Sequence, residues 1–196
     1  MSSSPARRGL CLVIAAPSGA GKSSISRALL GSEPALALSI SATTRAPRPG
    51  ERDGEHYHFL APDEFARRVA AGDFLEHVVY AGNQYGTLRS EIDRILGEGD
   101  SPIVEIELAG ARAVRDAIPG AVSIFISPPS LEELVARLTR RATDTEGEIA
   151  QRVRTSRVEL DAMNEFDHRV VNADVDTAVE DLTRVLADVL GEAAHG

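Results

Sequence analysis

The stretch that decides the fold is Leu10–Ser24, with the sequence LCLVIAAPSGAGKSS. The unbroken apolar run Leu10–Ala16 is typical of a strand that is buried on both faces of a parallel sheet. Gly19 and Gly21 follow, and glycine lets the backbone turn sharply and approach a ligand closely. Lys22 then opens an amphipathic segment that predicts a helix. A strand, a glycine-rich turn and a helix N-terminus in this order direct free N–H groups at one point, which is typical of a phosphate-binding loop.

The loop meets the pattern G-x-x-x-x-G-K-[ST] except at its first position, which is Ala16. Lys22 is also the single lysine among the 21 basic residues of the chain. Its compact ammonium, on a flexible stem, can reach β- and γ-phosphates where a rigid guanidinium fork is less suitable. The alternative is an ordinary glycine-rich turn followed by a surface lysine.

Composition sets the broad class of the protein. The length of 196 residues is that of one domain, and 43% hydrophobic with 26% charged residues is typical of a soluble globular protein. A formal net charge of −9 argues against nucleic-acid binding. No run of residues suggests a membrane span or a signal peptide, and residues 1–8 are expected to be a disordered tail. The lone Cys11, in a strand expected to be buried, predicts a reduced thiol and a cytoplasmic location.

Strand and helix patterns alternate along the chain, which predicts an α/β fold with a parallel sheet and helices on both faces. We expect further strands at residues 35–40, 102–108, 121–127 and 168–172, and helices at Pro62–Ala71, 109–118, 131–141, 149–166 and 175–190. Asp73–Leu88 predicts a strand, a Gly/Asn turn and the start of a helix that continues to Gly99. Residues 9–196 form a single domain, with a core at 9–40, 100–137 and 161–192 and insertions at about 41–99 and 138–160.

The first insertion carries a basic, proline-stiffened segment, TTRAPRPG. The guanidinium groups of Arg45 and Arg48, three residues apart, suit a second dianionic group, to which Tyr57 and Tyr85 can add hydroxyl donors. A solvated basic loop is the alternative.

Three carboxylates lie in apolar surroundings. Glu76 in FLEHVVY either faces solvent from an edge strand or awaits a ligand rich in N–H groups. Glu105 and Glu107 alternate with apolar residues, so both lie on one face near the C-terminal end of a strand, where open α/β sheets bind ligands. The alternative for these two is an edge strand with one wet face.

Arginines surround the polar link at 142–149, namely Arg137, Arg140, Arg141, Arg152, Arg154 and Arg157. Such a link can close over a polyphosphate and bring positive charge to it. A solvated helix face explains some of them. The sequence offers neither a metal-ligand spacing of histidines nor a pairing of nucleophile and base.

The chain carries, in this order, APSGAGKS, SATTRAPRPGE, DGEHYHF, FLEHVVYAGNQYGT, PIVEIELAGAR, FISPPS, RLTRRATDT and VVN. In the order and spacing of these segments it resembles the guanylate kinase family, from about Gly9 to Leu190. The resemblance implies a P-loop parallel-sheet core flanked by helices, with a GMP-binding insertion and a mobile lid. It also implies transfer of a phosphoryl group from ATP to GMP, and to dGMP, with Mg²⁺. Two rivals are a related kinase of a sugar phosphate such as ribose 1,5-bisphosphate and a non-catalytic guanylate-kinase-like binding module.

The resemblance also implies roles for individual residues. It assigns ATP to Ala16, Pro17, Ser18, Gly19, Ala20, Gly21, Lys22, Ser23, Ser24, Arg137 and Asn172. It assigns Mg²⁺ to Ser23, with the other ligands reached through water. It assigns the GMP phosphate to Ser41, Arg45, Arg48, Tyr57 and Tyr85, and the guanine side of the pocket to Glu76, Thr87, Glu105 and Glu107. It assigns catalysis to Lys22, Arg45, Arg141 and Arg152.

Three departures from the family pattern change the expected geometry. Ala16 replaces a glycine and is expected to add a methyl group beside the phosphates. Glu105 and Glu107 stand where aspartate is common, so their carboxylates reach one CH₂ further and their contacts there are expected to shift or to pass through water. Ala142 replaces a glycine that usually follows the arginine of the lid.

Overall fold

The computed structural model describes residues 9–80, 82–140 and 146–193. Its core is a five-stranded parallel sheet in the order β2–β7–β1–β8–β9. The strands are β1 (Leu12–Ala15), β2 (Leu36–Leu38), β7 (Ser101–Ile106), β8 (Val122–Ser127) and β9 (His168–Val171). The predicted α/β fold with a parallel sheet is confirmed, and the strand that precedes the glycine-rich loop lies at its centre.

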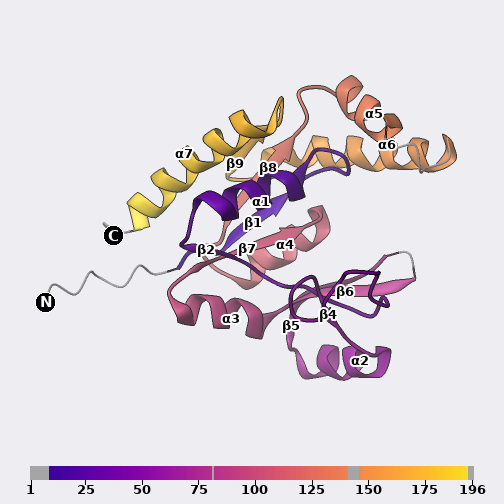
Figure 1. Ribbon diagram of the computed structural model, residues 1–196, viewed down its shortest axis with the longest axis vertical. Coiled ribbons are helices and arrows are strands. Elements are labelled where there is room, and N and C mark those ends of the chain that lie inside the picture. The colour runs from indigo at the N-terminus through magenta and orange to yellow at the C-terminus, as the bar shows by residue number, and fades with distance from the viewer. Residues whose placement is uncertain (1–8, 81, 141–145, 194–196) are drawn as a thin grey trace, which may run out of the picture.

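The centre of the sheet is fully enclosed because β1 sends alternate residues to two apolar clusters. Leu12 and Ile14 pack on one face with residues of α1 (Lys22–Ser32) and α7 (Val175–Ala193). Cys11 and Val13 pack on the other face with residues of α3 (Arg89–Glu98) and α4 (Leu108–Ala117). Figure 1 shows α1 and α7 on one side of the sheet and α3 and α4 on the other. Both faces are buried, which explains why the strand is an unbroken apolar run.

A second, smaller sheet is formed by residues 42–88, in the order β4–β3–β6–β5. Its strands are β3 (Ala42–Thr43), β4 (His58–Phe59), β5 (Phe74–Tyr80) and β6 (Asn83–Leu88). The helix α2 (Pro62–Ala71) has the bounds that the sequence predicts, and it buries Phe65 against Phe74 of β5. In Figure 1 this sheet and α2 lie at one end of the molecule, away from α7.

The prediction of a helix start within 83–88 is wrong, because these residues form β6, and α3 begins only at Arg89. Each edge of β6 has a partner: Gly86 pairs with Ala42 of β3, and Thr87 pairs with Glu76 of β5. Gly86 also fits only as glycine, since a Cβ there would lie 2.7 Å from a ring carbon of Phe74. Pairing on both sides therefore overrides the turn-like appearance of the local sequence.

The remaining helices lie at the other end of the molecule. They are α5 (Leu131–Arg140), α6 (Glu146–Asp161) and the short 3-10 helix η1 (Ala162–Glu165). The Ser130 hydroxyl accepts the Glu133 N–H at 3.2 Å and so caps the start of α5. The expected helix at 149–166 instead starts earlier and ends in η1. None of the described helices is long and apolar enough to span a bilayer.

Candidate functional site

The phosphate loop, residues 16–24, joins the C-terminal end of β1 to the start of α1. Gly19 and Gly21 have φ values of 91° and 93°, in the region that favours glycine. A Cβ on Gly21 would lie 2.3 Å from Nδ2 of Asn172, so the position is closed to any side chain. Asn172 directly follows the edge strand β9. It donates from Nδ2 to the Ala20 carbonyl at 2.6 Å and so holds the loop in place.

Ala16, the departure at the start of the loop, is buried in the core. It belongs to the same apolar cluster as Leu12 and Ile14, and it is 7% exposed. The alternation of β1 continues through this residue, so its methyl group turns inward. The substitution of glycine by alanine therefore adds core packing at this point.

Lys22 and Ser23 are the first residues of α1, and both contact the C-terminal end of β7. The Lys22 ammonium donates to the Ile106 carbonyl at 2.9 Å, and the Ser23 hydroxyl donates to Oε2 of Glu105 at 3.3 Å. Burial lowers the pKa of Lys22, while the carboxylates of Glu105, Glu107 and Glu159 oppose this shift. One ammonium thus faces three carboxylates at the mouth of the loop.

A cavity of about 380 Å³ extends from the phosphate loop to the second sheet. Its volume falls in the usual range for small-molecule sites. The cavity is lined by nine residues that the sequence singles out: Lys22, Ser23, Ser41, Tyr57, Glu76, Tyr85, Thr87, Glu105 and Glu107. Glu105 is in a central strand, so the alternative of a wet edge strand does not hold, and Glu107 follows the strand as the residue before α4.

Glu76 and Thr87 face each other across β5 and β6 at the far end of this cavity. Oε1 of Glu76 accepts the Thr87 N–H at 2.9 Å and the Thr87 hydroxyl at 2.8 Å. Burial raises the pKa of Glu76, although both Thr87 bonds favour its ionised form. Although β5 is an edge strand, Glu76 lines the cavity, so the alternative that it simply faces solvent is not what the structure has.

Arg45 is clamped beside the cavity by residues of its own loop. Its guanidinium makes two bonds of 2.9 Å to the carboxylate of Glu51 and lies 5.4 Å from the ring centre of Tyr57. Glu51 also accepts the N–H of Arg48 at 2.7 Å, and Arg45 holds the pKa of Glu51 at about 2. The Tyr57 ring contacts that of Tyr85, so Arg45 and both tyrosines come together. The side chain of Arg48 is exposed.

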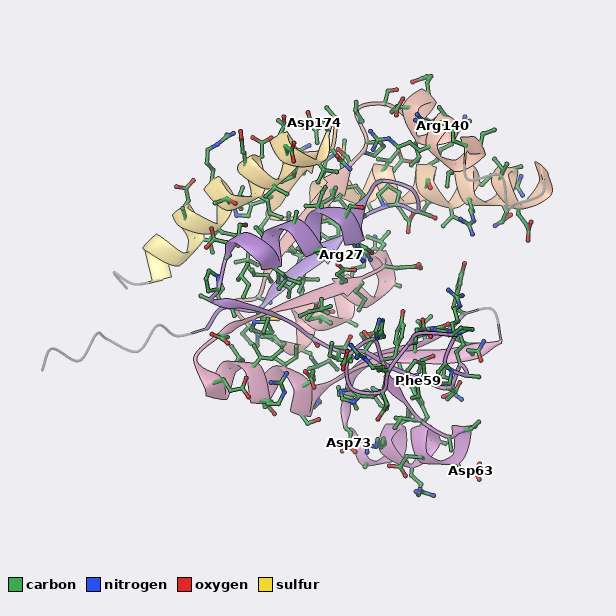
Figure 2. All side chains as sticks on the ribbon, in the orientation of Figure 1. Arg27, Phe59, Asp63, Asp73, Arg140 and Asp174 are labelled. Atoms are coloured by element: carbon green, nitrogen blue, oxygen red, sulfur yellow. The ribbon has the colours of Figure 1, made fainter. Side chains whose placement is uncertain are left out.

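A second cavity, of about 320 Å³, lies on the other side of the phosphate loop. It is lined by Gly19, Gly21, Ser24, Arg137, Arg140, Asn172, Ala173, Asp174 and Val175. Arg137 donates from Nη2 to the Asn172 carbonyl at 3.0 Å and is bound to Glu133. Figure 2 shows Arg140, from α5, and Asp174, before α7, on the same side of the molecule. The sequence singles out Arg140 only as one of the arginines around the polar link at 142–149, and it gives Asp174 no site role, because a polar residue beside a turn carries no specific signal.

The arginines predicted for the second insertion differ in their exposure to solvent. Arg141 and Ala142 lie outside the described residues. Arg152 is half-buried on α6, whereas Arg154 and Arg157 are exposed. A solvated helix face therefore accounts for the last two.

The whole-chain comparisons agree with this geometry. A family model described as guanylate kinase matches residues 8–189. The chain belongs to the guanylate kinase family. A guanylate kinase of Gluconobacter oxydans is 49% identical over 92% of this chain and 87% of its own length. One from Rubrobacter xylanophilus is 48% identical over 94% of this chain and 96% of its own. A crystal structure of guanylate kinase from Anaplasma phagocytophilum covers 93% of this chain, and this chain covers 86% of it, at 30% identity and a TM-score of 0.73.

Membership of the guanylate kinase family confirms the family and the fold class predicted from the sequence. Glu159 is a buried carboxylate that sequence reasoning missed. This glutamate lies in the arginine-bearing stretch of α6, where a charged residue is unremarkable. Its burial, to 7% exposure, is visible only in the folded chain.

Proposed function

We propose that this protein transfers the γ-phosphoryl group of ATP to GMP, and also to dGMP, giving ADP and GDP or dGDP. The observation that carries the proposal is the shape of the cavity that extends from the phosphate loop to the second sheet. It has a phosphate loop with Lys22 and Ser23 at one end and the Glu76–Thr87 pair at the other. A donor phosphate and an acceptor base would therefore lie within one continuous space.

Glu76 and Thr87 suit guanine in particular. Guanine presents its N1–H and its N2 amine side by side, and one carboxylate can accept from both. Adenine has an acceptor at N1, so it would leave the half-buried carboxylate of Glu76 unpaired, and sites built in this way reject the wrong base strongly. The Thr87 hydroxyl, whose proton goes to Glu76 in the free protein, would have to turn to donate to O6 of guanine. Glu105, which bonds Ser23, and Glu107 line the same cavity nearer the phosphate loop.

The acceptor phosphate is assigned to Ser41, Arg45, Arg48, Tyr57 and Tyr85. Arg45 supports this assignment best, because Glu51 holds its fork in a fixed place before any substrate arrives. A positioned fork loses little conformational freedom when it binds an anion. The exposed Arg48 can join from its neighbouring position on the loop.

The transfer step needs position and charge rather than a base, because the attacking oxygen of GMP is already anionic. Lys22 and the arginines Arg137, Arg141 and Arg152 would neutralise the charge of the transferring group. ATP would lie along the phosphate loop, residues 16–24, with Asn172 at its adenosine side. The segments at about 41–99 and 138–160 would act as the GMP-binding part and the lid. The buried thiol of Cys11, whose pKa burial raises to about 12, suits a reducing cytoplasm.

The residues at the loop fit a bound Mg²⁺. The exposed Ser23 hydroxyl and the Glu105 carboxylate are adjacent hard oxygen groups beside the phosphate loop. Among the described residues, no group of three or more His, Cys, Asp or Glu side chains could hold a metal by itself. Mg²⁺ would then depend on Ser23, on phosphate oxygens and on water, and when bound it would neutralise phosphate charge.

The test is an ADP-release assay with Mg-ATP and a panel of AMP, CMP, UMP, GMP and dGMP. We expect turnover with GMP and dGMP alone. Equal turnover of AMP, or none with GMP, would overturn the proposal. Ribose 1,5-bisphosphate belongs in the same panel, because a sugar-phosphate kinase would use it while ignoring GMP. A non-catalytic binding module would release no ADP with any acceptor, although the intact phosphate loop argues against that alternative.

A further inference from the structure

Glu159 is a buried acid for which the proposed reaction has no role. It lies on α6, is 7% exposed, and its Oε2 has no hydrogen-bond partner among the described residues. A buried carboxylate oxygen without a partner is costly to keep ionised. Its neighbour one turn earlier, Ser156, is also buried with an unpartnered hydroxyl. This face of α6 therefore presents two unused polar groups to the interior.

The surroundings of Glu159 connect it to the phosphate loop. Of the charged groups on the elements packed around it, two act on it among the described residues: Lys22 at the start of α1 and Glu107 before α4. Both of these residues line the cavity between the phosphate loop and the second sheet. Burial and the charge of Glu107 raise the pKa of Glu159 to about 7, and Lys22 opposes them. Glu159 therefore interacts electrostatically with one ammonium and one carboxylate that line the cavity.

We propose that Glu159 is a further residue of the phosphate site, which takes up one proton from solvent when the phosphate chain of ATP binds beside Lys22. The neutral acid then has an O–H group to donate from the oxygen that lacks a partner in the free protein. The proposal rests on the proposed function only in taking ATP as the ligand. Nothing in it depends on phosphoryl transfer.

The reason lies in how charge changes at the site. Bound ATP brings several negative charges to Lys22, whose ammonium otherwise favours the ionised form of Glu159. A group that is half protonated near neutral pH is then pushed to its neutral form. In the alternative, Glu159 remains ionised and keeps Lys22 charged and oriented. Glu159→Gln distinguishes the two alternatives. At about pH 8 it should bind ATP more tightly than the wild type if Glu159 takes up a proton, and more weakly if Glu159 stays ionised.

Proton uptake can be measured by titrating calorimetry with a non-hydrolysable ATP analogue and Mg²⁺. The titration is repeated at about pH 8 in two buffers with different heats of ionisation. We expect the wild-type protein to take up close to one proton more than Glu159→Gln, because free Glu159 is mostly ionised there. Protons released by the ligand itself are the same in both proteins and cancel in the difference. Uptake that persists in Glu159→Gln belongs to groups other than Glu159.

The affinity gives a second measurement. Between about pH 7 and pH 8.5 the dissociation constant of the wild-type protein should rise roughly tenfold more than that of Glu159→Gln. At the upper pH the variant should bind the analogue more tightly than the wild type. Asp161→Asn is the matched control, since Asp161 is an exposed carboxylate on the same helix and should leave both results unchanged.

The outcomes separate the two proposals. Equal proton uptake in wild type and Glu159→Gln, or weaker binding by that variant at every pH, overturns the role of Glu159. Failure of the wild-type protein to bind the ATP analogue at all overturns the proposed function instead. A cooperative melting transition of Glu159→Gln shows whether the variant is folded before either result is interpreted.

Discussion

Lys22 owes its position to one hydrogen bond with the backbone. Its ammonium donates to the carbonyl of Ile106, the last residue of β7, so the side chain bridges the first helix and a central strand. A guanidinium is planar and longer, and it cannot make the same single contact from the same Cα. Every other basic position among the 21 Lys and Arg residues of the chain is arginine, and this contact explains why position 22 is lysine.

Lys22→Arg should therefore lose most of kcat, by about two orders of magnitude, while the protein remains folded. The measurement is steady-state kinetics with Mg-ATP and GMP beside a melting curve. Arg27→Lys is the matched control, since Arg27 is an exposed basic residue on the same helix. Normal turnover by Lys22→Arg would contradict the argument from the lone lysine.

Glu76 is the residue on which discrimination between bases should depend. In Glu76→Gln one carboxylate oxygen becomes an NH₂ group, which opposes a donor of guanine. We expect kcat/KM for GMP to fall by about 10²-fold or more, and the preference for GMP over AMP to shrink with it. Val79→Thr, at an exposed position of the same strand, should leave both values unchanged. An unaltered GMP-to-AMP ratio in Glu76→Gln would remove Glu76 from the base pocket.

At the scale of elements, the gap between α4 and β5 is set by a glycine. A Cβ on Gly110 would lie 2.3 Å from Cδ1 of Ile106 and 3.2 Å from Oε2 of Glu76. The helix of the core and the strand of the small sheet therefore approach each other at the carboxylate of Glu76. Any side chain at position 110 must displace one of these two neighbours.

Gly110→Ala should raise KM for GMP several-fold while changing the melting temperature little. The added methyl group favours the helix by up to about 1 kcal/mol, and this offsets the strain at Ile106. Gly97→Ala in α3 is the control, because nothing lies within 4 Å of a Cβ there. We expect that control to be slightly stabilised with normal KM. A loss of stability in Gly110→Ala without any change in KM would show that the contact serves packing alone.

Elements with strong local signals could be predicted from the sequence, and those decided by pairing could not. The helix Pro62–Ala71 has proline at its start and Phe65 on its buried face, and both signals are local. β6 is different, because its strand character comes from two partners that lie before it in the chain. Turn-forming residues such as Asn83 and Gly86 conceal that pairing.

The candidate site shows the same division. Lys22 and the paired glycines of its loop form a pattern along the chain, so their place in one phosphate-binding loop followed from spacing. Burial of Glu159 and the inward turn of Ala16 depend on which faces of α6 and β1 meet other elements. The distance between such residues along the chain carries no information about those faces.

For the whole molecule, Glu159 links stability to pH. Its pKa of about 7 in the folded protein exceeds the usual 4.5, so the folded state binds this proton more tightly than the unfolded state. The stabilisation of the folded protein by protonated Glu159 is complete below about pH 4.5 and is lost as the pH rises through 7. The loss is at most about 3 kcal/mol. Glu159→Gln should therefore unfold at a higher temperature than the wild type at about pH 8 and show no such advantage at about pH 5. An equal difference at both pH values would contradict the assigned pKa.

The parallel pairing of β1 has a consequence for how the chain is made. Leu12 pairs with Ile103 and with Val122, so both neighbours of the central strand are synthesised about 90 residues or more after it. At ribosomal speeds of about 5–20 residues per second, that delay lasts roughly 5–20 seconds. Throughout it this apolar segment has no partner strand, while the small sheet of residues 42–88 can already close. The nascent chain should therefore depend on chaperones most during synthesis of residues 42–88.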